Sequence, residues 1–182
     1  HARRRESFMN PSAARSPEEH PSPVERMLAG IDPDDVPTAG VDPIDSRSEA
    51  IAAVSLVVSR PLRAETVVLT LDAEHRGVGM VAIDGTDGAR SVETIAAHLD
   101  TVIALADSAQ HALGISRDPT ERVVIITVDP TGSTPHHRPD QLDRLCEGAG
   151  VELLDWLALG PDTVTPMVDD RWPRSVSAVQ PE

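Results

Sequence analysis

The segment spanning residues 123–160 constrains the fold of this chain more than any other. Its sequence is VVIITVDPTGSTPHHRPDQLDRLCEGAGVELLDWLALG. The pattern predicts a buried strand, a loop rich in Pro and Gly, a helix that begins near Pro139 and ends at Gly150, and a second strand. Continuous apolar runs of this kind are typical of strands that are covered on both faces of a sheet.

The residues before this segment predict further helices and strands. Ser46 and Glu49 form a capping-box pattern that opens a helix, and Pro61 is expected to end it. The other predicted elements are strand 66–71, strand 77–83, helix 91–113, strand 122–128, the helix from residue 139 and strand 151–159. The two strands 66–71 and 77–83 are expected to form a hairpin. Helices that alternate with buried strands predict an α/β protein, a three-layer α/β/α sandwich with a mixed sheet.

The ends of the chain have a different composition. Residues 1–41 are rich in proline and poor in large apolar side chains, so we expect a disordered arm with at most a helical turn near Val24–Leu28. One domain is expected over residues 42–165. Residues 166–182 are expected to form an irregular tail, from which Trp172 could dock back on the domain.

Charge and composition exclude several classes of function. The net charge is −14, which disfavours nucleic-acid binding, except through a basic cluster at Arg3, Arg4 and Arg5. No apolar run is long enough for a membrane span, no signal-peptide pattern is present, and a cytoplasmic location is the default expectation. Cys146 is the single cysteine, so an internal disulfide and a Cys-based zinc site are excluded, and a small core residue is expected there.

Two glycines, Gly77 and Gly79, fall inside a predicted strand. They lack the third glycine and the following helix of a dinucleotide-binding fingerprint, so a bulge or close packing is the better interpretation.

The pattern Pro130-x-Gly132, the following Thr134-Pro135 and the segment 150–160 carry a family resemblance. Over about residues 42–160 the chain resembles the RadC-like branch of the JAMM/MPN (JAB domain) superfamily of bacterial metalloproteases and their relatives. The resemblance implies a cytidine-deaminase-like architecture. It also implies a zinc site in which two His and one Asp bind the metal, a Glu acts as general base and a Ser stabilises the intermediate.

Carried over residue by residue, the resemblance implies that most of this site is replaced. The two His positions are Thr127 and Asp129, and the Ser position is His137. The general-base position falls on Glu65 and the Asp ligand on Asp140. Threonine is a poor zinc ligand, and two carboxylates alone do not make a zinc site of the usual kind. The resemblance therefore implies a catalytically inactive domain without a cofactor, which acts as an interaction module for an unidentified protein partner.

One alternative retains enzymatic activity. Asp129, His136, His137 and Asp140 lie close together in the sequence and could bind a divalent metal such as zinc in a rearranged geometry, as in a metal-dependent peptidase or isopeptidase. The competing interpretation is a polar surface loop with Asp140 favourably placed in the first turn of a helix. If the resemblance holds, four residues should converge at one end of the sheet: Glu65, Thr127, Asp129 and Asp140.

Overall fold

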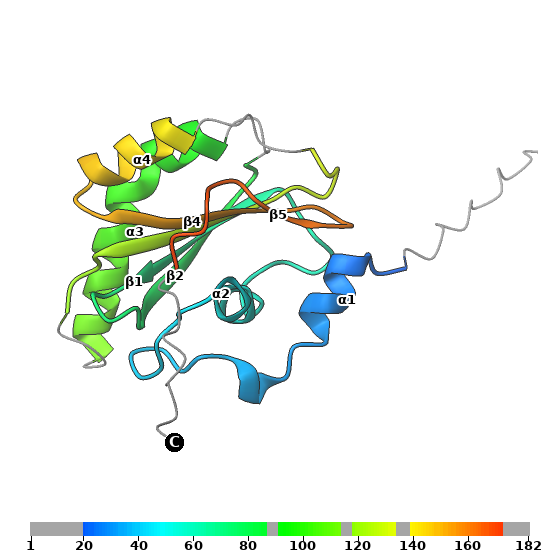
Figure 1. Ribbon diagram of the computed structural model, residues 1–182, viewed down its shortest axis with the longest axis horizontal. Helices are drawn as coiled ribbons and strands as arrows, with labels where there is room; N and C mark the ends of the chain where they lie inside the picture. The colour runs from blue at the N-terminus through cyan, green and yellow to red at the C-terminus, as the bar shows by residue number, and fades with distance from the viewer. Residues whose placement is uncertain (1–19, 87–90, 114–117, 134–138, 173–182) are drawn as a thin grey trace, which may run out of the picture.

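The computed structural model describes residues 20–86, 91–113, 118–133 and 139–172. In this part the chain forms a mixed α/β fold with a five-stranded sheet and four α-helices (Figure 1). The elements are α1 (Pro23–Ala29), the 3₁₀ helix η1 (Pro33–Asp35), α2 (Arg47–Val54), β1 (Glu65–Leu71), β2 (Gly77–Asp84), α3 (Ser91–Leu113), β3 (Arg122–Val128), α4 (Pro139–Gly148), β4 (Glu152–Leu159) and β5 (Val164–Pro166).

The strands lie in the order β2-β1-β3-β4-β5. β3 and β4 are parallel, whereas the other neighbours are antiparallel. The expected hairpin of β1 and β2 is therefore confirmed. β1 is buried along its whole length, which is the burial that its continuous apolar sequence predicts.

Helices cover both faces of the sheet (Figure 1). On one face, α3 and α4 pack over a core that contains Val68, Ile125 and Trp156. On the other face, α1 and α2 pack over a second core that contains Val67, Ile126 and Leu157. Successive residues of a strand point to opposite faces, so every buried strand contributes to both cores.

Most expected elements agree with the structure to within a residue or two, but α2 is shorter than expected. It ends at Val54 rather than continuing to Pro61. The hydroxyl of Ser55 donates a hydrogen bond of 2.7 Å to the carbonyl oxygen of Ala52, a local interaction that competes with continued helix. The chain then passes through turns that bury Val58.

For residues 20–41 the expectation of a disordered arm needs correction, whereas the helical turn expected near Val24–Leu28 is present as α1. Here α1 begins with a complete capping box, in which Ser22 and Glu25 each accept a hydrogen bond from the other's backbone N–H. Val24 and Leu28 are buried in the core beneath the sheet. Two apolar side chains spaced by four residues are enough to dock this short helix, because the domain supplies the surface that covers them. Residues 1–19 lie outside the described part.

The C-terminal segment is also more ordered than an irregular tail. β5 pairs with β4, and Met167 and Val168 are buried. Trp172 docks on the domain, as expected: its side chain is buried and its indole Nε1 donates a hydrogen bond to Asp155 at 2.6 Å. Residues 173–182 lie outside the described part.

Gly79 permits close contact between β2 and α3. A Cβ atom at this position would lie 3.0 Å from the Cβ of Ala106, closer than real side chains pack. Close packing, rather than nucleotide binding, explains this glycine. In the part of the chain that the structure describes, no helix is both long and apolar enough to span a lipid bilayer.

Candidate functional site

Three of the four residues expected to form the site come from the start of β1 and the end of β3, which lie side by side at one end of the sheet. β1 begins where β3 ends, and Glu65 is the register partner of Val128. The backbone N–H of Asp129 donates to the carbonyl oxygen of Leu159 at 2.9 Å, which joins the ends of β3 and β4. Glu65, Thr127 and Asp129 therefore share one end of the sheet.

Their side chains do not share one centre. Thr127 pairs with Thr66 and lies on the α3 and α4 face, where Trp156 Nε1 donates to its hydroxyl oxygen at 3.1 Å. Glu65 is level with Val128, whose side chain belongs to the core on the opposite face. Because side chains level with each other on paired strands point to the same face, Glu65 and Thr127 point to opposite faces.

The Glu65 carboxylate is almost fully buried, with the residue 1% exposed. One of its oxygens accepts a hydrogen bond from the backbone N–H of Ser59 at 2.7 Å, and the other accepts one from the Ser59 hydroxyl at 3.1 Å. Both oxygens thus hold the segment that follows α2 against the start of β1. This arrangement gives Glu65 a structural role.

The Asp129 carboxylate shapes the loop that follows β3. Its Oδ1 accepts hydrogen bonds from the backbone N–H of Thr131 at 2.8 Å and from the Thr131 hydroxyl at 2.6 Å. The backbone carbonyl of Asp129 accepts a further bond from the N–H of Gly132 at 3.0 Å. Gly132 has a φ of +73°, and it lies against Pro161 and Gly160 of the neighbouring loop. Pro130 is exposed on this turn. The loop is an Asx-type turn, for which Asp and Gly are the expected residues.

Asp140 lies in the exposed first turn of α4. It lines a pocket of about 450 Å³ together with charged residues, among them Arg47 and Asp143, and with apolar ones such as Met167. Among the residues that the structure describes, no hydrogen bond or ion pair joins any two of the four expected site residues: Glu65, Thr127, Asp129 and Asp140. His136 and His137, the two imidazoles of the alternative metal site, lie outside the described residues.

The described residues at the family's motif positions do not fit its zinc ion. The Thr127 hydroxyl is buried and engaged by an indole N–H, and Glu65 points away from it. Metal ligands need free lone pairs that converge on one point, supported by a second shell that orients them. In this chain the hydrogen bonds of Glu65 and Asp129 hold neighbouring loops and do not orient metal ligands.

A second group of carboxylates surrounds the guanidinium of an arginine. Asp72, Glu74 and Asp118 have oxygens close enough to share a metal ion. The guanidinium of Arg76 forms ion pairs with all three, at 2.8, 2.9 and 3.1 Å. This arginine already supplies the positive charge of the cluster. Nearby, His75 is half-buried rather than exposed as a turn residue would be, with its Nδ1 3.0 Å from an Asp45 oxygen.

Sequence reasoning missed the role of Asp155 as a buried charge. Asp155 is fully buried in β4, and its carboxylate accepts hydrogen bonds from Arg47 Nε at 2.6 Å, Trp172 Nε1 at 2.6 Å and its neighbour's backbone N–H at 2.9 Å. The single acidic residue inside the apolar run LLDWLAL was the available signal.

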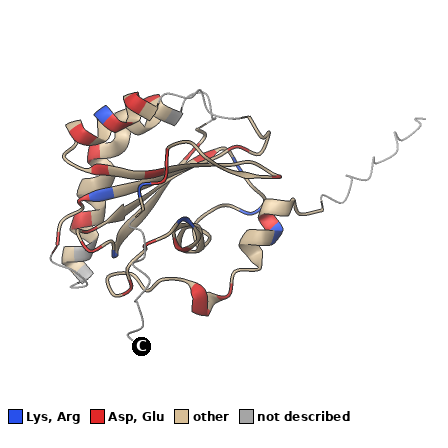
Figure 2. Ribbon diagram, viewed as in Figure 1, with Lys and Arg blue, Asp and Glu red and all other residues tan. Residues whose placement is uncertain are grey.

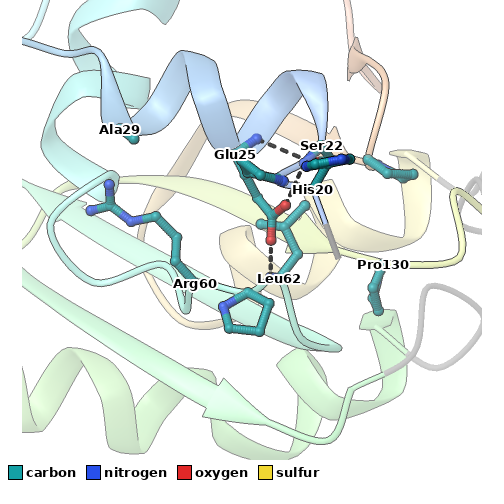
Figure 3. A pocket seen from close by; sticks show the side chains of 10 residues that line it. His20, Ser22, Glu25, Ala29, Arg60, Leu62 and Pro130 are labelled. Atoms are coloured by element: carbon teal, nitrogen blue, oxygen red, sulfur yellow. Dashed lines mark hydrogen bonds between the residues drawn. The ribbon is translucent and has the colours of Figure 1, made fainter. Parts of the chain in front are cut away.

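A groove adjoins the Asp129 loop and was also missed, because residues 20–41 were assigned to the arm. It has a volume of about 800 Å³ and lies between α1, the segment at residues 60–62 and the loops that follow β3 and β4 (Figure 3). Glu25 lies in the wall of the groove. Its two carboxylate oxygens accept hydrogen bonds from the backbone N–H of Ser22 at 2.6 Å and of Leu62 at 2.7 Å. These two backbone hydrogen bonds, from Ser22 first and then Leu62, lower the pKa of Glu25.

No protein-family model and no curated protein matches this chain. The family resemblance therefore rests on the residues and the element order described above.

Proposed function

We propose that this chain is a RadC-like domain with the three-layer α/β/α JAMM/MPN architecture, catalytically inactive, which works in the cytoplasm as a protein-interaction module. The order helix, strand, strand, helix, strand, helix, strand from α2 to β4 supports the proposal. The Asp129–Gly132 turn at the end of β3 supports it as well, because the family places its Pro and Gly in this loop.

One observation supports the proposal that the domain is catalytically inactive. The polar groups at three of the motif positions each hold neighbouring structure: Thr127 binds Trp156, Asp129 binds Thr131 and Glu65 binds Ser59. A zinc hydrolase needs ligands aimed at the metal and a base aimed at its water. Side chains that are buried and already hydrogen bonded in separate places cannot serve these roles without rearrangement. A fold of this kind can persist for binding alone.

Zinc content and hydrolysis test this proposal. We expect the purified full chain, dialysed against zinc and analysed by mass spectrometry for metals, to hold far less than one zinc per chain. We also expect no turnover of peptide or isopeptide substrates above the uncatalysed rate.

The alternative gives the opposite result. One zinc per chain, lost in His137→Ala or Asp140→Ala but kept in the exposed control Asp162→Ala, would contradict the proposal. It would support a metal-dependent hydrolase with ligands from Asp129, His136, His137 and Asp140.

Nucleic-acid binding forms no part of the proposed function. A chain with a net charge of −14 repels a phosphate backbone, and binding through Arg3, Arg4 and Arg5 alone would depend strongly on salt. We expect fluorescence anisotropy of labelled DNA at low salt to stay flat. A salt-sensitive rise in anisotropy, lost on deletion of these three arginines, would show that DNA binding belongs to the function.

A further inference from the structure

We propose that the groove beside α1 binds an extended peptide segment of a protein partner, in which Asp or Glu residues accompany apolar side chains. The inference rests on the proposed function as an interaction module and names the surface and the chemistry of the partner. It is carried by the position of the groove, the chemistry of its walls and the distribution of charge around it.

The groove lies where α/β proteins usually bind ligands. Pro130 and Pro161 follow β3 and β4, so they mark the carboxyl ends of the two parallel strands of the sheet. Ligands of open α/β sheets bind outside the carboxyl ends of such strands. The volume of about 800 Å³ is sufficient for several side chains of a bound segment.

The walls favour a peptide over a phosphate group. Four prolines, Pro21, Pro61, Pro130 and Pro161, line the groove, and proline has no backbone N–H to donate. Two other N–H groups in its lining, those of Ser22 and Leu62, are already bound to the Glu25 carboxylate. Phosphate sites depend on free backbone N–H groups, whereas rigid apolar surfaces bind the side chains of extended segments.

The charge around the groove favours an acidic partner. Figure 2 shows acidic residues on most elements of the molecule, whereas α1 carries both a basic residue, Arg26, and an acidic one, Glu25, whose carboxylate is already held by two backbone N–H groups. Arg60 lines the groove, and its guanidinium donates one hydrogen bond of 2.9 Å to the carbonyl oxygen of Ser55. Within the described residues, Arg26, Arg60 and Arg63 form no ion pair, although all three are exposed.

Of the other described arginines, all but Arg144 on α4 show a contrast. Arg47, Arg76, Arg122 and Arg171 each pair with a carboxylate of this chain. Arg60 lines the groove, and Arg26 and Arg63 each follow a lining residue, Glu25 and Leu62, along the chain. In an acidic protein, cations without a carboxylate partner beside an apolar groove complement an anionic segment. The apolar lining and these cations together fit carboxylates that flank apolar side chains.

Peptide selection followed by charge reversal tests the inference. Random twelve-residue peptides displayed on phage are selected against the full chain, and the recovered peptides are synthesised with a fluorescein label. We expect the recovered sequences to combine Asp or Glu with apolar residues. In anisotropy titrations, Arg60→Glu should weaken their binding at least about tenfold, since an attractive contact becomes repulsive.

Two matched controls separate the groove from general effects. Arg144 is exposed on α4 and, like Arg60, donates one hydrogen bond to a backbone carbonyl, so Arg144→Glu should change the affinity less than about twofold. Ala29→Trp should block the groove and abolish binding, whereas Ala97→Trp, at an exposed position of α3, should leave it unchanged. Thermal unfolding of each variant checks that it is folded.

Several outcomes would overturn the inference. Recovery of no peptides, recovery of peptides without acidic residues, or binding that survives both Arg60→Glu and Ala29→Trp would each do so. Competition by inorganic phosphate or by a short oligodeoxythymidine would show that the groove serves a phosphate ligand instead. Selected peptides that bind elsewhere would refute the groove but leave the interaction module intact. Stoichiometric zinc with hydrolysis would refute the proposed function itself.

Discussion

Asp155 joins three segments that are far apart in the sequence. Its carboxylate joins β4 to Arg47 at the start of α2 and to Trp172 near the end of the described chain. Arg47 also donates to the carbonyl oxygen of Val168 at 3.2 Å, so the same ion pair fixes the segment after β5. A buried charge of this kind is costly unless each of its partners is present.

We predict that Asp155→Ala lowers the free energy of unfolding by about 3 kcal/mol, because buried donors lose their acceptor. Urea denaturation followed by tryptophan fluorescence measures this change, and the emission of the folded variant should show that the Trp172 side chain is more exposed to water. Asp143→Ala serves as control, because its ion pair with Arg171 at 2.6 Å is partly exposed and should contribute less than about 1 kcal/mol. Equal losses in the two variants would contradict the buried role of Asp155.

Cys146 provides a second prediction for a single residue. The thiol is buried on α4, and desolvation is the main cause that raises its pKa to about 12. We predict that a thiol-specific reagent at mildly alkaline pH labels the native chain at least about 100-fold more slowly than the urea-unfolded chain. The chain has one cysteine, so the labelling rate reports on this site alone.

The raised pKa of Cys146 also fixes the direction of a pH effect. The folded state retains the thiol proton to higher pH than the unfolded state does. This contribution to stability is therefore complete below the unfolded pKa near 9 and is lost as the pH rises towards 12. Rapid labelling under native conditions would contradict the burial of α4 on the sheet.

At the scale of elements, the Pro and Gly residues at helix ends and the spacing of apolar residues were sufficient to predict the helices and strands in the central part of the chain. Gly150 and Pro139 mark the ends of α4, and α3 follows its apolar spacing from Ser91 to Leu113. The sequence predicts a helical turn near Val24–Leu28, but the docking of α1 and the pairing of β5 could not be predicted, because short segments of this kind are stabilised by tertiary contacts rather than by their own propensity. The packing of Val24 and Leu28 is visible only once the sheet is formed.

The candidate site shows a similar limit. The sequence places Glu65 next to a strand, but β1 is buried on both faces and so lacks the alternation that would show which face each residue takes. A residue can thus match a family pattern along the chain and still point away from the other site residues. Only the register of β1 against β3 shows the direction of Glu65.

The docking of α1 can be tested through Leu28, which is 2% exposed. We predict that Leu28→Ala lowers the free energy of unfolding by about 3 kcal/mol, since the change leaves a cavity between α1 and the sheet. Met27→Ala, one residue earlier and 42% exposed, should change it by less than about 0.5 kcal/mol. Urea denaturation measures both, and a neutral Leu28→Ala would mean that residues 20–41 do not belong to the folded domain.

At the scale of the whole molecule, the excess of carboxylates opposes the compact state. The net charge at neutral pH is −14 and the isoelectric point is near 4.8. Repulsion among exposed carboxylates is screened by salt, whereas the buried Arg47–Asp155 pair is screened much less. Salt should therefore weaken the unfavourable interactions more than the favourable ones.

We predict that raising sodium chloride from about 20 to about 200 mM at pH 7 increases the thermal midpoint by roughly 2–4 °C, which corresponds to about 1 kcal/mol for a chain of this size. The increase should shrink near pH 5, where the net charge approaches zero. Hydrogen bonds lower the pKa of Glu25 and of Asp143 in the folded state, so their contributions are still present at pH 5 and are lost only as the pH falls below their unfolded values near 4. Differential scanning calorimetry at both pH values measures the effect. A midpoint that falls with salt at pH 7 would show that exposed ion pairs, such as those around Arg76, outweigh the repulsion.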